Sequence, residues 1–67
     1  MTETRYPNVE VTLVGEDGNA FAILGRVSRA LRQADVTNGE VNTFIEEATH
    51  GNYDELLATV ARWVTVL

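Results

Sequence analysis

The side chains with the clearest potential for metal chemistry are one histidine and two nearby glutamates. His50 is the only histidine in the sequence, and Glu46 and Glu47 precede it by four and three residues. At this spacing all three would share one flank of a helix, but a catalytic zinc site needs three rigidly held protein ligands. His50 also falls where a helix is predicted to end, and a cationic histidine is stabilised by the helix dipole there. We therefore predict a capping or solvent-exposed role for His50 and no metal site.

Nucleophilic and phosphate-binding chemistry also lacks the residues that it needs. The chain has no cysteine, which excludes thiol chemistry, disulfides and cysteine-bound zinc. Ser28 is not part of a G-x-S-x-G nucleophile motif. The turn from Gly15 to Asn19 lacks the lysine and hydroxyl residue of a phosphate-binding loop, and its acidic residues are too few for a calcium loop. We therefore predict a protein that is not an enzyme and uses no cofactor.

Three arginines form the most distinctive polar group. Arg26 and Arg29 lie together on the polar face of a predicted helix, with Arg32 at its flank. The acidic residues concentrate elsewhere, at Glu40, Glu46, Glu47, Asp54 and Glu55. The arginine face either meets an acidic protein or nucleic acid, or is an ordinary solvated surface whose ion pairs each contribute about 0–1 kcal/mol.

Trp63 completes the candidate interaction surface, which consists of Arg26, Arg29, Arg32 and Trp63. An exposed tryptophan is a frequent interface hot spot. However, the helical spacing of Trp63 from Leu56 and Val60 is more typical of a core position.

The overall charge and hydropathy argue against two classes of partner. The net charge is −5, and an acidic surface repels nucleic acid and anionic membranes. Residues 1–8 are polar and lack the apolar region of a signal peptide, and no apolar run approaches the roughly 20 residues of a membrane span. We expect a cytoplasmic protein.

The elements that carry these residues follow from hydrophobic periodicity. At 67 residues the chain forms one small domain, residues 1–67, and residues 1–7 are predicted to be frayed. Alternation of apolar and polar residues over 9–14 predicts a half-buried strand. Apolar residues spaced by three and four positions predict helices over 20–34, 38–49 and from Tyr53 onward.

The segment 64–66 leaves two alternatives open. Val64, Thr65 and Val66 either continue the third helix or form a short strand, because β-branched residues favour strands. The strand at 9–14 needs a mate, which is either this segment or the same strand in a second copy. We favour the internal pairing. The predicted fold class is therefore α+β, β-α-α-α with a short C-terminal strand pairing with the N-terminal strand.

Local signals define the helix ends. Asp17 or Asn19 can cap the first helix, Thr37 with Glu40 matches a capping box, and Asn52 can cap the third helix. Gly51 is predicted to end the second helix in a left-handed conformation. Gly25 lies inside the first helix at a cost of about 1 kcal/mol relative to alanine. The predicted core is Val9, Val11, Leu13, Phe21, Leu24, Val27, Leu31, Val41, Phe44, Ile45, Leu56, Leu57, Val60 and Val64.

Three segments resemble a group of very small bacterial and phage proteins without an assigned function. They are VTLVGEDGNAFAILGRV at 11–27, YDELL at 53–57 and RWV at 62–64. The resemblance covers nearly the whole chain and is most specific over 17–27. It implies a bacterial or phage setting and carries no activity, ligand or catalytic residue.

These features favour a small non-catalytic protein-interaction or accessory module, with a second copy of the chain or another protein as partner. The thin core expected of so short a chain and the strand that needs a mate are the main reasons. The alternative is a nucleic-acid-binding regulator that uses Arg26, Arg29 and Arg32.

Overall fold

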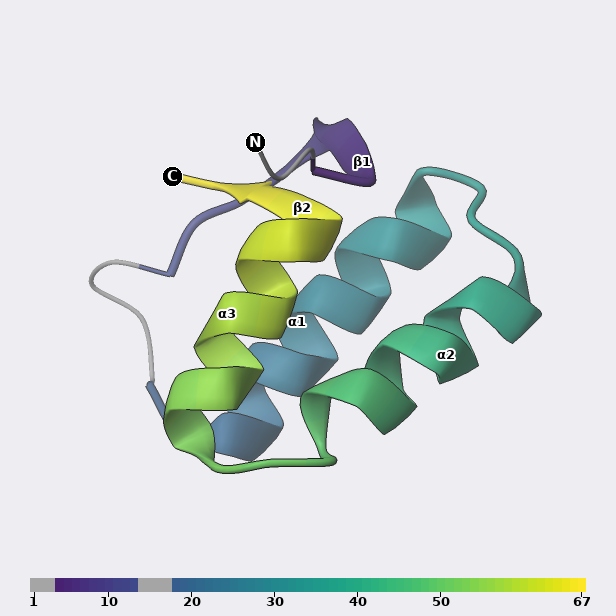
Figure 1. Ribbon diagram of the computed structural model, residues 1–67. Coiled ribbons are helices and arrows are strands. Elements are labelled where there is room, and N and C mark those ends of the chain that lie inside the picture. Colours follow the sequence, from purple (N-terminus) through teal and green to yellow (C-terminus); the bar gives the residue numbers. More distant parts are fainter. Residues whose placement is uncertain (1–3, 14–17) are drawn as a thin grey trace.

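A strand, three helices and a second short strand follow one another along the chain (Figure 1). The computed structural model describes residues 4–13 and 18–67. The elements are β1 (Tyr6–Val11), α1 (Ala20–Gln33), α2 (Asn38–Ala48), α3 (Tyr53–Trp63) and β2 (Val64–Val66). The radius of gyration is 10.8 Å, close to the value of about 11 Å expected for a folded chain of this length. The predicted α+β class, with an internal strand pair, is confirmed.

Each helix begins at a side chain that caps it. Asn19, Thr37 and Asn52 each accept a hydrogen bond from the backbone N–H three residues further on, which satisfies one of the free donors at a helix start. Of the two predicted caps for α1, Asn19 is the one observed, and Asp17 lies outside the described residues. The helix starts are therefore set by local sequence.

The helix ends follow different rules. At the end of α1 the N–H groups of Asp35 and Val36 donate to the carbonyls of Arg32 and Leu31, both at 3.0 Å, and Asp35 has a φ of 65°. This is a Schellman motif in which an aspartate takes the place usually held by glycine. The prediction for Gly51 is wrong, because α2 is closed at Thr49 and the φ of Gly51 is not in the left-handed region.

The two strands are parallel and pair with an irregular register. Tyr6 is opposite Val64 and Val11 is opposite Val66, and the register shifts between Tyr6 and Glu10. The Leu67 N–H donates to the Val11 carbonyl at 2.9 Å. Because β2 follows α3 without a loop, the last turn of α3 places β2 directly beside β1 (Figure 1).

β1 occupies different residues from the predicted strand 9–14. It begins at Tyr6, and Thr4 and Arg5 are also bonded to α3, through the carbonyls of Ala61 and Arg62. The expectation of a frayed start is therefore wrong for residues 4–7, while residues 1–3 and 14 lie outside the described residues. The alternation of apolar and polar side chains does not reveal that the chain is held from Thr4 onward, because the contacts there are hydrogen bonds to backbone carbonyls of α3. β1 ends at Val11 because its last partner in β2 is Val66, where β2 itself ends.

The core lies between the sheet and the inner faces of the three helices. Its buried apolar residues are Val9, Val11, Ile23, Val27, Leu31, Val41, Phe44, Ala48, Leu56, Val60, Trp63 and Val64. Leu13, Leu24, Ile45 and Leu57 pack against it and are half-buried. Phe21 is wrongly predicted: 87% of it is exposed, because it lies in the first turn of α1, beyond the neighbours that cover Leu24. Within the described residues no helix combines the length and apolar character needed to cross a membrane.

Replacing Gly25 by alanine is expected to raise the free energy of unfolding by about 1 kcal/mol, the helix-propensity difference between the two residues. Gly25 occupies a middle position of α1 and is exposed to solvent. A Cβ added there would meet no neighbouring atom within 4 Å. Urea unfolding followed by circular dichroism measures the change. Gly51→Ala is the control, because Gly51 lies between α2 and α3, outside any helix, and so gains no helix propensity. An equal rise in the free energy of unfolding for Gly25→Ala and Gly51→Ala would contradict this account.

Candidate functional site

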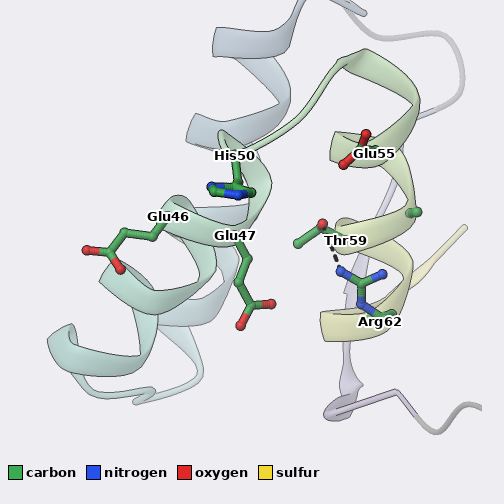
Figure 2. Close-up of a pocket in the computed structure, with 7 residues that line it drawn as sticks. Glu46, Glu47, His50, Glu55, Thr59 and Arg62 are labelled. Carbon is green, nitrogen blue, oxygen red and sulfur yellow. Dashed lines mark hydrogen bonds between the residues drawn. The ribbon is translucent and has the colours of Figure 1, made fainter.

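The end of α2 and the facing side of α3 form an open groove around His50 (Figure 2). The groove has a volume of about 490 Å³, and Glu46, Glu47, Glu55 and Arg62 also line it. All five of these residues are exposed. The His50 N–H donates to the Glu47 carbonyl at 3.3 Å at the end of α2. No group of three metal-ligating side chains lies close enough to hold an ion anywhere in residues 4–13 and 18–67.

Trp63 is buried, not exposed, and it contacts the rings of both Phe44 and Tyr6. Only 2% of it is accessible. Its ring contacts Phe44 edge-on, with centroids 5.6 Å apart, and stacks on Tyr6 at 5.9 Å. The Arg5 guanidinium lies over the ring, 4.5 Å from the centroid, and the indole N–H donates to the Glu47 carboxylate at 3.0 Å. The core position that the helical spacing of Trp63 favoured is therefore confirmed, and Trp63 is not part of an exposed interaction surface.

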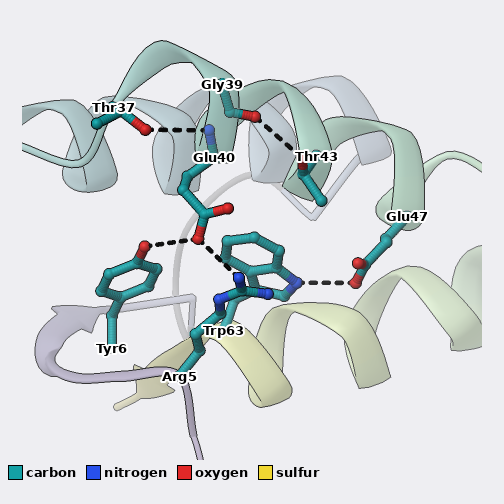
Figure 3. A network of polar contacts seen from close by, with 8 residues as sticks. All are labelled: Arg5, Tyr6, Thr37, Gly39, Glu40, Thr43, Glu47 and Trp63. Atoms are coloured by element: carbon teal, nitrogen blue, oxygen red, sulfur yellow. Dashed lines mark hydrogen bonds and ion pairs between the residues drawn. The ribbon is translucent and has the colours of Figure 1, made fainter.

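Glu40 ties the N-terminal strand to the start of α2 (Figure 3). Its carboxylate accepts from the Tyr6 hydroxyl at 2.9 Å and from Arg5 at 2.8 Å. Its backbone N–H donates to Thr37. The predicted capping box is thus half formed: Thr37 caps the helix, but the glutamate side chain points to β1 instead of returning to the backbone of Thr37.

This contact predicts a loss of stability at alkaline pH. The hydrogen bond to the Glu40 carboxylate raises the pKa of Tyr6 above its ordinary value of 10.0, and burial acts in the same direction. The folded state therefore favours the neutral phenol, so the stabilisation is complete below pH 10 and is lost as pH rises through the raised pKa. Tyr6→Phe should flatten the fall of unfolding free energy above pH 10 in urea titrations. An unchanged pH dependence in Tyr6→Phe would contradict this role.

The three arginines of α1 differ in exposure and surroundings. Arg29 and Arg32 are exposed, whereas Arg26 is half-buried and interacts within the chain. Arg26 and Arg29 line a groove beside β1. Arg32 lies in the last turn of α1, where a cation is stabilised by the helix dipole. Arg26 and Arg29 therefore line the groove, and Arg32 lies beyond it at the end of the helix.

A second surface, not foreseen from the sequence, is an apolar cleft of about 260 Å³. The N-terminal ends of α1 and α3 and the C-terminal end of α2 meet there. Phe21 stands at its edge with 87% of its surface exposed, and Tyr53 is 45% exposed. Among the described residues that line this cleft none is charged. The available hint in the sequence was that Phe21 falls in the first turn of its helix. Hydrophobic periodicity assigns Phe21 to the apolar face of the helix, but it does not tell whether another element covers that end.

Fold and surfaces together define the class of this molecule as a small α+β domain with an aromatic core and three different surfaces. These are the acidic groove at His50, the apolar cleft at Phe21 and the groove between β1 and α1. No protein-family model, no curated protein and no solved structure matches the chain.

Proposed function

We propose that this chain is a non-catalytic protein-interaction module that uses the apolar cleft at Phe21 as its contact surface. The observation that carries the proposal is the exposure of Phe21, 87% of which is accessible. An exposed aromatic side chain at the edge of a cleft can act as an anchor in a protein interface. Covering it would contribute about 1.5–3 kcal/mol.

The surroundings of Phe21 support an apolar partner surface. Leu24 and Leu56 line the cleft together with the half-exposed ring of Tyr53, whose hydroxyl donates to the Gly18 carbonyl. That hydrogen bond holds the Tyr53 ring in place, so the cleft is preformed and little ordering is needed on binding. None of the residues within 4–13 and 18–67 that line the cleft is charged, so these side chains do not repel a second copy of the chain. The partner is a second copy or another protein with an apolar patch.

The test compares two single substitutions of exposed apolar residues. Phe21→Ser removes the anchor, and Leu67→Ser removes an apolar side chain that is 55% exposed outside the cleft. Sedimentation equilibrium reports self-association. A photo-crosslinking amino acid at position 21, incorporated in cells that express the protein, captures any other partner. We expect self-association that Phe21→Ser abolishes and Leu67→Ser preserves, or crosslinks from position 21 that Leu67→Ser preserves. A monomer without any crosslink from position 21 would contradict the proposal.

A further inference from the structure

The size of the apolar cleft at Phe21 limits what can fill it. Its volume of about 260 Å³ is below the roughly 300–1,000 Å³ of most small-molecule pockets. Leu24, Leu56 and the Tyr53 ring line the cleft, and Phe21 stands at its edge. The cleft therefore suits one large apolar side chain of a partner, against which the exposed Phe21 ring can pack.

Two carboxylates stand at the border of this cleft. Tyr53 and Leu56 line it, and Asp54 and Glu55 lie between them in the first turn of α3. The Glu55 carboxylate occupies the space that a Cβ on Gly51, another lining residue, would need. Glu55 also lines the acidic groove at His50 (Figure 2). It therefore stands between the groove and the cleft, and both carboxylates are exposed.

These carboxylates are available to a partner. None of the hydrogen bonds and ion pairs within residues 4–13 and 18–67 involves the side chain of Asp54 or Glu55. No lysine or arginine occurs over residues 33–61, where His50 is the one basic residue. The first turn of α1, across the cleft, carries no charge. The described border of the cleft is therefore negatively charged.

A second copy of the chain is a poor occupant of the cleft. A protein interface of standard size has about 20–30 residues on each side, so one centred on the cleft would extend to Asp54 and Glu55. A two-fold dimer uses the same patch on both copies, which would bring these carboxylates close to their own counterparts. Like charges that face each other across an interface disfavour association. The acidic border therefore favours a different protein as partner.

We propose that the cleft binds a short basic segment of another protein, in which an apolar side chain lies beside a lysine or arginine. This inference rests on the proposed function and adds the chemistry of the partner. The apolar side chain enters the cleft next to Phe21, and the neighbouring cation contacts Glu55 and Asp54. Burial of the apolar group supplies the affinity, and the exposed ion pairs supply selectivity and faster association. The same carboxylates repel nucleic acid and anionic membranes.

The experiment uses phage-displayed random peptides as the probe and the full chain as bait. We expect selected sequences to carry lysine or arginine within a few positions of a large apolar residue. In calorimetric titrations of one selected peptide, Phe21→Ser should weaken binding at least about tenfold. Glu55→Gln should weaken it about threefold, and its combination with Asp54→Asn about tenfold. Glu10→Gln is the matched control, because it removes the same charge from an exposed glutamate of β1 outside the cleft.

The outcomes separate this inference from the proposed function. In ¹⁵N NMR titrations the amides of Phe21, Tyr53 and Glu55 should shift when the peptide is added. Selection of neutral or acidic peptides, or of none, would overturn the inference, as would equal effects of Glu55→Gln and Glu10→Gln. Crosslinks from position 21 to a second copy of the chain would also overturn it, but they would support the proposed function. Only a monomer without any crosslink from position 21 would contradict both.

Discussion

Replacement of Trp63 by alanine is expected to remove a large part of the free energy of unfolding at 25 °C. Truncation of a buried tryptophan costs about 3–5 kcal/mol. A chain of 67 residues has a total stability of only about 3–10 kcal/mol at the usual 0.05–0.15 kcal/mol per residue. The loss is large because the indole contacts Phe44, Tyr6, Arg5 and Glu47 at once. Far-ultraviolet circular dichroism with urea titration measures the folded fraction.

Trp63→Phe is the matched control for this prediction. It keeps an aromatic ring beside Phe44 and Tyr6 but removes the indole N–H that donates to Glu47, so its loss should be clearly smaller than that of Trp63→Ala. The alternative interpretation of Trp63 as an exposed hot spot makes the opposite prediction, with weakened partner binding and unchanged stability. A stable Trp63→Ala protein would contradict the core role.

Glu40→Ala is expected to lower the free energy of unfolding by about 2 kcal/mol. It removes a hydrogen bond with a charged acceptor, of the kind that contributes about 1.5–3 kcal/mol. It also removes the ion pair with Arg5, whose side chain is half exposed, and such surface pairs add only about 0–1 kcal/mol. The main loss is therefore the contact with Tyr6.

A double-mutant cycle with Tyr6→Phe isolates this contact. The energies of Glu40→Ala and Tyr6→Phe should not add, because each removes the same hydrogen bond. Glu40→Gln is the control, since its amide oxygen can still accept from Tyr6 while the charge facing Arg5 is lost. Strict additivity of the two substitutions in urea unfolding would show that the hydrogen bond contributes nothing.

The parts of the fold that were predicted correctly depend on local sequence. Asn19, Thr37 and Asn52 cap their helices through bonds that span three residues, so a short window contains the whole signal. The spacing of Val41, Phe44 and Ala48 likewise reports one face of one helix, and all three are buried. For 64–66 the β-branched residues left helix and strand open, and the observed pairing with the N-terminal strand is the alternative that was favoured because a lone strand needs a mate.

The parts that were not predicted depend on contacts far apart in the sequence. Tyr6 and Arg5 are held by Glu40 and Trp63, so no pattern local to residues 4–8 indicates these contacts. Phe21 fits the apolar stripe of α1, and its exposure follows only from where α2 and α3 end. The arginines of α1 were singled out from the sequence, but a groove beside them requires knowledge of which edge of β1 stays open.

The pairing of β1 with β2 has a consequence for protein synthesis. The two partners are Tyr6–Val11 and Val64–Val66, so the ribosome must release more than fifty further residues before the first strand finds its mate. The helices can form while the chain emerges, but Val9 and Val11 remain uncovered until the C-terminal segment has been synthesised. A premature stop before residue 64 would yield three helices without a closing sheet. In such a product Val9 and Val11 would lose the cover of β2, and exposed apolar surface of this kind promotes aggregation.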